Sequence, residues 1–316
     1  MYKSFFGLKE NPFNVNPDPR YLYFTKQIEE TVTGLMYGIQ TRKGFITLTG
    51  EVGTGKTTLV NRLMEWLHQR KARTAFLFNS RMNTHQLFDF ILAEFDIPCD
   101  SKSKSQKLMK LNQWLLDRYR NGETVVLIVD EAQNLTFPVL EEIRLLTNLE
   151  TSTEKLLQII LSGQPELEEK LKLPELRQLR QRIMLRCKTA QLTIGETREY
   201  VYDRLKTAGA TDGSIFSPQA LDAIHLYSMG IPRVINLLCE HALVNAFAEN
   251  QRPIQSKIIE EVAQEFQLDE LEPIAPERSS KLGTDVYQSE AFLQNLGEAL
   301  SRFRLSPSDP PTRGRK

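Results

Sequence analysis

The sequence has little of several features that define common protein classes. Its three cysteines, Cys99, Cys187 and Cys239, form no CxxC pair and have no histidine at ligand spacing, which argues against a disulfide scaffold or a zinc site. No run approaches the roughly 18 apolar residues that a membrane-spanning helix requires, and the N-terminus lacks the apolar block of a signal peptide. We therefore expect a cytoplasmic protein with buried thiols and no membrane insertion.

Net charge is also missing. The 40 basic and 40 acidic residues cancel, so no global field draws the chain to nucleic acid or to an anionic membrane. One basic cluster stands out, formed by Lys102, Lys104, Lys107 and Lys110, but no aromatic residues accompany it and a solvated face explains it. The length, in contrast, is ample: 316 residues predict about two domains at roughly 150 residues each.

An alternation of strand and helix patterns begins at residue 45. The apolar, β-rich runs are 45–49, 74–78, 124–129, 156–161 and, more weakly, 183–187. They are mostly continuous rather than alternating, which is typical of strands buried on both faces, and the segments between them are long enough for crossover helices. The pattern predicts an α/β domain over residues 44–192, a parallel sheet with helices on both faces.

The segment after residue 193 has no strand pattern. Helices are predicted at 195–208, 217–227, 231–250 and 255–266, where Ser217 and the prolines at 218 and 232 mark helix starts. We therefore predict a small all-helical domain over residues 193–268.

The two ends of the chain differ from these domains. Residues 1–24 are rich in aromatic residues and proline, and we expect an extended arm laid over a domain surface, followed by a first helix up to residue 43. Residues 269–316 form an acidic, proline-bearing tail in which Phe292, Leu296, Leu300 and Phe303 recur at helical spacing. The tail pattern fits a short helix that docks on a partner, or an isolated helix in a flexible tail.

The most specific motif lies directly after the first predicted strand. Residues 50–57, GEVGTGKT, match the phosphate-loop pattern GxxxxGK[ST] between a strand and a helix. In such a loop, backbone N–H groups point at the phosphates of ATP, Lys56 reaches the β- and γ-phosphates and the Thr57 hydroxyl ligates Mg²⁺. The predicted nucleotide contacts in this segment are Gly50, Glu51, Val52, Gly53, Thr54, Gly55, Lys56, Thr57 and Thr58.

Two carboxylates follow the third predicted strand. Asp130 and Glu131 end the apolar run 125–129, at the sheet edge where ligands bind in parallel sheets, so they should emerge beside the phosphate loop. Asp130 is predicted to hold the hydration shell of Mg²⁺ and Glu131 to orient and polarise the attacking water. A single Asp suffices for nucleotide binding, so the added Glu argues for ATP hydrolysis.

Two weaker features fit the same chemistry. Ser162 and Gln164 follow the fourth predicted strand, where either could contact the γ-phosphate or the water, although many strands end in this way. Arg177, Arg180 and Arg182 precede the last strand, and one of them could be an arginine finger on a neighbouring subunit's nucleotide. A solvated arginine face is the alternative.

These motifs together resemble those of AAA+ ATPases. The sequence GIPR at residues 230–233 is similar to the family's sensor-2 motif, which implies that Arg233 contacts the nucleotide from a helical lid. The resemblance also implies a five-stranded sheet in which a third strand separates the phosphate-loop strand from the acidic strand. It favours Arg182 as the finger, and it leaves sensor 1, usually Asn, to Ser162 or Gln164.

The finer resemblance is to the general secretion pathway protein A family of ATPases. It rests on residues 2–23 and on the blocks at 43–45, 50–55, 130–135 (DEAQNL) and 163–167 (GQPEL). Secretion-type members carry a transmembrane helix and a peptidoglycan-binding module, neither of which is evident here. The sequence is more similar to the soluble members associated with exosortase and exopolysaccharide loci.

Three hypotheses follow. The first is an Mg²⁺-dependent ATPase that forms a homo-oligomeric ring or filament and helps build a secretion or exopolysaccharide-export apparatus through an unidentified protein client. The second is an ATP-dependent DNA-binding switch of the transposition target-selection type, which the neutral charge does not favour. The third is a nucleotide-gated scaffold that recruits a partner through the tail. In each of them Tyr21, Tyr23 and Phe24 could cover the adenine ring or pack on the sheet domain.

Overall fold

The computed structural model describes residues 1–14, 16–78, 81–211, 214–268, 300–301 and 303. The chain divides into two compact units. The first, here called the helical unit, contains residues 1–25, 53–55 and 190–268. The second, here called the sheet unit, contains residues 26–52 and 56–189 together with the described residues 300, 301 and 303.

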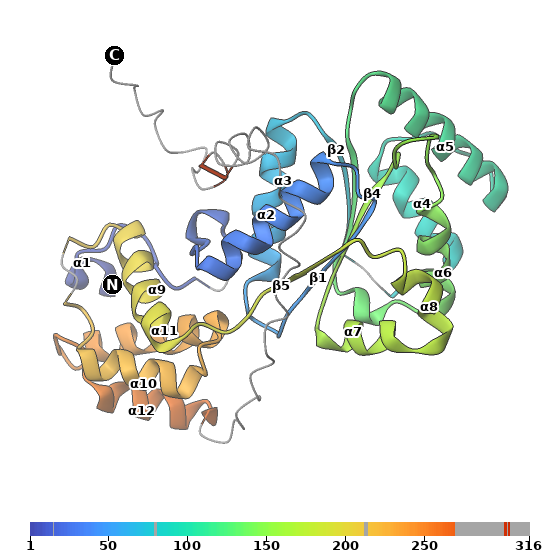
Figure 1. Ribbon diagram of the computed structural model, residues 1–316. Coiled ribbons are helices and arrows are strands. Elements are labelled where there is room, and N and C mark those ends of the chain that lie inside the picture. The colour runs from blue at the N-terminus through green and yellow to red at the C-terminus, as the bar shows by residue number, and fades with distance from the viewer. Residues whose placement is uncertain (15, 79–80, 212–213, 269–299, 302, 304–316) are drawn as a thin grey trace, which may run out of the picture. The chain divides into compact units, whose positions relative to one another are not determined.

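Five parallel strands form the centre of the sheet unit (Figure 1). They are β1 (Phe45–Thr49), β2 (Arg73–Leu77), β3 (Val125–Val129), β4 (Gln158–Gly163) and β5 (Leu185–Lys188). Their order is β2-β3-β4-β1-β5, with every neighbouring pair parallel. This confirms the predicted five-stranded P-loop sheet, in which β4 separates the strand before the phosphate loop from the acidic strand.

Helices cover both faces of this sheet (Figure 1). One face carries α2 (Lys26–Gln40) and α3 (Lys56–Gln69), and the other carries α4 (Thr84–Glu94), α5 (Lys104–Arg120), α6 (Phe137–Leu146), α7 (Pro165–Lys172) and α8 (Arg177–Arg180). Short 3₁₀ turns lie at η2 (Ala132–Asn134) and η3 (Pro174–Leu176). Alternate strand side chains such as Leu127 and Ile159 pack into one fully buried cluster with α4 to α8.

The inner strands of the sheet are buried on both faces, whereas the two outer strands, β2 and β5, are partly exposed. All five residues of β1 and all five of β3 are buried, which explains why continuous apolar runs located them. On the face opposite to the α4–α8 cluster, α2 approaches β1 closely. A Cβ placed on Gly38 would lie 2.5 Å from Ile46 Cδ1, so any larger residue there would require the Ile46 side chain to shift.

Four helices make up most of the helical unit. They are α9 (Ile194–Thr207), α10 (Pro218–Ser228), α11 (Pro232–Ala248) and α12 (Ser256–Glu265), each close to its predicted position. The Thr193 side chain caps α9 in a capping box with Glu196, and Ser217 caps α10 by accepting a hydrogen bond from the backbone N–H of Ala220.

The N-terminal arm belongs to the core of the helical unit, which corrects the expectation of a segment laid over a surface. It contains α1 (Tyr2–Phe6) and η1 (Pro19–Tyr21). Phe6, Leu8 and Phe13 are at most 7% exposed and share one buried cluster with α9 to α12. The composition of the arm predicted an aromatic segment but not its burial. Because several of its rings are buried among the helices, the arm is part of the hydrophobic core of the helical unit.

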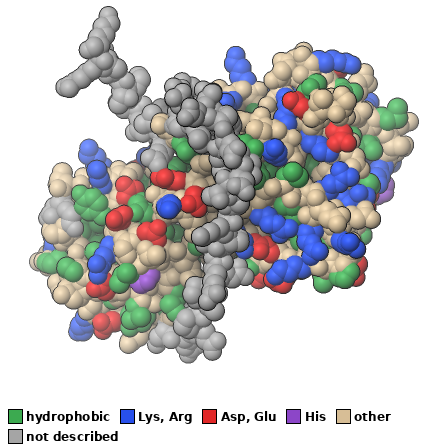
Figure 2. Space-filling view, viewed as in Figure 1, with side chains coloured by type: hydrophobic (Ala, Val, Ile, Leu, Met, Phe, Trp, Pro, Cys, Tyr) green, Lys and Arg blue, Asp and Glu red, His purple; other side chains and the backbone are tan. Residues whose placement is uncertain are grey.

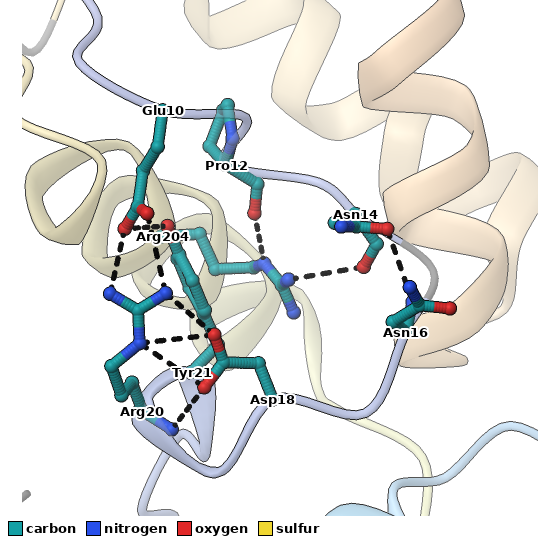
Figure 3. Close-up of polar contacts among 8 residues, drawn as sticks. All are labelled: Glu10, Pro12, Asn14, Asn16, Asp18, Arg20, Tyr21 and Arg204. Atoms are coloured by element: carbon teal, nitrogen blue, oxygen red, sulfur yellow. Dashed lines mark hydrogen bonds and ion pairs between the residues drawn. The ribbon is translucent and has the colours of Figure 1, made fainter.

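A buried arginine fastens the arm to α9 (Figure 3). The Arg204 guanidinium donates to the carbonyl of Pro12 at 2.6 Å and to the Tyr200 hydroxyl at 2.6 Å, and it lies 4.5 Å from the centre of the Tyr21 ring. Tyr21 is 6% exposed and donates its hydroxyl to Glu10 at 2.9 Å. The ring of Tyr21 is therefore occupied within the helical unit, which corrects the suggestion that it covers adenine.

The end of the predicted tail helix contacts the sheet unit. Phe292 and Leu296 lie outside the described residues, whereas Phe303 is 1% exposed and its carbonyl accepts a hydrogen bond from Arg62 Nε of α3 at 2.5 Å. Over the residues that the structure describes, no helix combines the length and the apolar character needed to cross a membrane.

Candidate nucleotide site

The phosphate loop leaves β1 and enters α3. Lys56, the first residue of α3, donates from Nζ to the carbonyls of Gly50 at 2.7 Å and Glu51 at 2.8 Å, so its ammonium lies on the loop itself. Burial lowers the pKa of Lys56, while the carboxylates of Glu131 and Asp130 act in the opposite direction and raise it. An anion in the loop would favour the charged form of this lysine further.

Thr57 and Asp130 supply the predicted metal ligands. The Thr57 side chain is exposed at the start of α3. Asp130 is 8% exposed, and its Oδ1 accepts from the Ser162 hydroxyl at 2.7 Å and from the backbone N–H of Glu131 at 3.0 Å. Oδ2 of Asp130 has no hydrogen-bond partner among the described residues, so it is open to a metal-bound water.

These donors fit Mg²⁺ better than a metal held by a full set of protein ligands. The described residues contain no group of three or more His, Cys, Asp or Glu side chains that could hold a metal ion. Mg²⁺ typically takes one or two protein oxygens and completes its shell with phosphate oxygens and water. One hydroxyl and one carboxylate at the phosphate loop match that requirement.

Glu131 has an unusual backbone and a directed side chain. Its φ of 51° and ψ of 37° lie in the left-handed region, which costs a non-glycine residue about 1–2 kcal/mol. Its Oε2 accepts from Gln133 Nε2 at 2.5 Å and from Gln164 Nε2 at 3.1 Å. The backbone thus turns sharply after Asp130 and aims the two acidic side chains differently.

The structure also distinguishes the two sensor-1 candidates. Ser162 is fully buried and bonded to Asp130, whereas Gln164 is half-buried and bonded to Glu131. Gln133 was not among the predicted site residues. The clue that could have identified it was its place in the DEAQNL block, two residues after Glu131, where a short turn can bring its side chain back.

Arg182 lies near the amino ends of the parallel strands, whereas the phosphate loop lies at their carboxyl ends. The chain pairs Met184 with the first residue of β1 through an N–H to O=C bond at 2.9 Å, so Arg182 precedes the amino edge of β5. It lines a hollow of about 450 Å³ together with Glu150, Lys155 and others. The five residues of β1 separate this edge from the loop by roughly 16 Å, so Arg182 does not meet the phosphate loop of its own chain.

The other arginine candidates lie nearby. Arg177 is exposed, and Arg180 Nη1 donates to the carbonyl of Lys172 at 3.4 Å.

Arg233, the predicted sensor-2 residue, belongs to the helical unit, as the second residue of α11. Its N–H donates to the carbonyl of Gly53 at 3.2 Å, and a Cβ on Gly53 would lie 2.8 Å from Arg233 Cβ, so Gly53 is fixed as glycine by contacts in that unit.

Comparison with known proteins defines the class. The family model "AAA domain" matches residues 39–171. Two solved structures share the fold: the ORC2 protein of Aeropyrum pernix, in ADPNP and ADP complexes (TM-score 0.59, 16% identity, 84% of this chain and 75% of that chain), and CDC6P of Pyrobaculum aerophilum (TM-score 0.58, 18% identity, 78% and 70%). The chain has the AAA+ fold, and its residues 39–171 match the AAA domain.

The family within this class follows from a curated relative. The general secretion pathway protein A of Aeromonas hydrophila is 44% identical to this chain over 255 residues, which are 80% of this chain and 46% of the relative. The chain belongs to the general secretion pathway protein A family. It spans about half the length of this curated relative.

Proposed function

We propose that this protein binds ATP with Mg²⁺ in the phosphate loop and hydrolyses it with Glu131 as the general base. The observation that carries the proposal is the position of Asp130 and Glu131 at the carboxyl end of β3. Strand β4 alone separates β3 from β1, which feeds the phosphate loop, so the acidic pair and Lys56 share one edge of the sheet.

Each residue has a separate role in this mechanism. The loop N–H groups and Lys56 would bind the phosphates, and Thr57 and Asp130 would hold Mg²⁺, which would supply positive charge that neutralises the phosphates. Glu131 Oε2 is occupied by two amide donors, whereas its Oε1 accepts no hydrogen bond from the described residues. Oε1 is therefore the atom that accepts the proton of the attacking water. In doing so it orients the lone pair of the water oxygen toward the γ-phosphorus.

A second copy of the chain would complete the site. Arg182 lies too far from the phosphate loop of its own chain to contact its γ-phosphate, which supports a finger that acts between subunits of a homo-oligomeric ring or filament. Figure 2 shows Lys and Arg side chains gathered over the part of the sheet unit that contains α7 and α8. Arg182 remains the first candidate, and Arg233 would contact the nucleotide from the helical unit.

Replacing the general base tests the mechanism. We expect Glu131→Gln to lower ATP turnover by at least about 100-fold, because the amide cannot accept the proton, while the affinity for a fluorescent ATP analogue stays within about twofold. Glu169→Gln, the same chemical change at an exposed residue of α7, should leave turnover unchanged. Wild-type turnover in Glu131→Gln would overturn the assignment of the base.

We further propose that this ATPase acts in the cytoplasm on a protein client of a secretion or exopolysaccharide-export apparatus. The support is the family membership, and the relative's name assigns a secretion role to that protein. In cells that produce this protein, Glu131→Gln should stop export of secreted protein or of polysaccharide. Measuring both exported materials separates the two systems, and normal export of both would contradict the proposal.

The lysine cluster that could have favoured the DNA-binding alternative is mostly paired within the sheet unit. Lys104 pairs with Glu142, Lys107 pairs with Asp89, and Lys110 donates to the carbonyl of Pro98 at 2.8 Å. A cluster whose charges are satisfied internally adds little to phosphate-backbone binding. Retention of the protein on duplex DNA that depends on ATP and falls steeply with salt would restore that alternative.

A further inference from the structure

We propose that Gln133 is a positioning residue for ATP hydrolysis, which fixes the orientation of the Glu131 carboxylate through a carboxamide held at both ends. The inference rests on the proposed role of Glu131 as the general base. It adds a residue that touches neither nucleotide nor water and acts through Glu131.

The carboxamide of Gln133 has one possible orientation. Its Oε1 accepts the backbone N–H of Gln164 at 3.1 Å, so its Nε2 must point the other way, toward Glu131 Oε2 at 2.5 Å. A flipped amide would place an oxygen against the carboxylate and its NH₂ group against the Gln164 N–H, which loses both hydrogen bonds. The chemistry of the partners therefore determines the direction of the amide.

The surroundings of Gln133 hold it in this place. A Cβ on Gly163 would lie 2.8 Å from Gln133 Oε1, so glycine at the end of β4 leaves the space that this side chain occupies. Lys170 of α7 donates to the main-chain carbonyls of Gln133 and Leu135, which fastens the η2 turn to α7. Contacts from β4 and from α7 therefore converge on one glutamine.

This arrangement has a consequence for the reaction. With two N–H donors on Oε2, the Glu131 carboxylate cannot rotate without breaking both bonds, and Oε1 remains as the acceptor for water. General bases work only when the accepting atom is held in line with the proton, and a misplacement of about 1 Å can cost on the order of 100-fold in rate. Gln133 also joins Glu131 to the main chain at the β4–α7 junction.

Two near-isosteric variants test the inference. Gln133→Met keeps the length of the side chain and removes both hydrogen bonds, and Gln133→Glu replaces the donor by a second carboxylate. We expect kcat for ATP to fall on the order of 10- to 100-fold in Gln133→Met and further in Gln133→Glu, with the affinity for an ATP analogue unchanged. Gln113→Met, the same change at an exposed residue of α5, is the matched control.

The Glu131→Gln background decides whether Gln133 acts through Glu131. In that background, Gln133→Met should cause no further loss of the residual turnover, because the base is already absent. A kcat for Gln133→Met within twofold of wild type, or an equal loss with and without Glu131, would overturn the inference while the proposed function stands. If Glu131→Gln itself retains full turnover, the proposed function fails and this inference fails with it.

Discussion

Asp130 and Glu131 are neighbours in the sequence, yet they take hydrogen bonds from different side chains. The left-handed backbone of Glu131 separates the two carboxylates, so that Ser162 reaches Asp130 and Gln164 reaches Glu131. Motif comparison could name Ser162 and Gln164 only as alternatives for one role. The geometry gives each of them its own partner: Ser162 bonds Asp130, for which we propose the metal role, and Gln164 bonds Glu131, for which we propose the role of base.

This separation predicts different defects in two alanine variants. Ser162→Ala removes the hydrogen bond that orients Asp130, so we expect a several-fold increase in the Mg²⁺ concentration needed for half-maximal turnover. Gln164→Ala should lower kcat without changing the Mg²⁺ requirement, because it affects Glu131 only. Steady-state ATPase assays over a Mg²⁺ titration measure both. Identical Mg²⁺ curves for the two variants would contradict the assignment.

The cysteines offer a second test at the residue scale. Burial raises the pKa of the Cys187 thiol to about 12 and the pKa of Cys239 well above its ordinary value, and both side chains are at most 1% exposed. At pH 8 we therefore expect iodoacetamide to modify Cys99 alone in the native protein and all three thiols in urea. Peptide mass spectrometry resolves the sites. Native labelling of Cys187 would contradict the described packing.

At the scale of elements, continuous apolar runs in the sequence predicted the strands well but misplaced some strand ends. The run at 45–49 was predicted to the residue because β1 lies inside the sheet, between β4 and β5, and all five of its residues are buried. The fourth strand was predicted to end at residue 161, but Ser162 and Gly163 continue it, paired with Leu48 and Thr49 of β1. A serine can lie inside a buried strand when its hydroxyl has a partner such as Asp130, and the sequence does not show that partner.

For the site and for the arm as well, the sequence does not show which residues come into contact in the folded chain. The phosphate loop and the acidic pair were predictable because each is a contiguous motif beside a strand. Gln133 was not, since its role depends on a left-handed turn at Glu131 and on the space that Gly163 leaves. The arm was expected on a surface because a single sequence shows that Phe13 is apolar but not which helices surround it.

The attachment of the arm to α9 can be tested at Arg204. Replacing Arg204 by Met removes its hydrogen bonds to Pro12 and Tyr200 and leaves buried acceptors unsatisfied, so we expect the free energy of unfolding of the helical unit to fall by about 2–4 kcal/mol. The control is Arg198→Met, on the same helix, whose ion pair with Asp222 is about half exposed. That change should cost less than about 1 kcal/mol. Urea titrations followed by circular dichroism measure both, and equal losses would contradict the special role of Arg204.

At the scale of the molecule, each unit has its own buried cluster. Phe88 of α4 lies in the core of the sheet unit and Phe13 of the arm lies in the core of the helical unit, and both are at most 1% exposed. Separate cores permit separate unfolding transitions, for which a single two-state description fails. The proposed nucleotide contacts Lys56, Thr57 and Asp130 belong to the sheet unit, whereas Gly53–Gly55 and Arg233 belong to the helical unit. Because the proposed lysine and metal-binding groups lie in the sheet unit, we expect ATP to act mainly on the transition of that unit.

Calorimetry of two core variants tests this division. Phe88→Ala should lower the free energy of unfolding of the sheet unit by about 3–5 kcal/mol, and Phe13→Ala should lower that of the helical unit by a similar amount. Each change leaves a cavity where a ring was packed. Leu226→Ala, at a 65% exposed position of α10, should move neither transition. Saturating Mg²⁺ and ATP with Glu131→Gln, which prevents turnover, should stabilise the sheet unit by about 2.7 kcal/mol at 100 times Kd. If both phenylalanine variants shift one common transition equally, the two cores unfold together and nucleotide binding stabilises the whole chain.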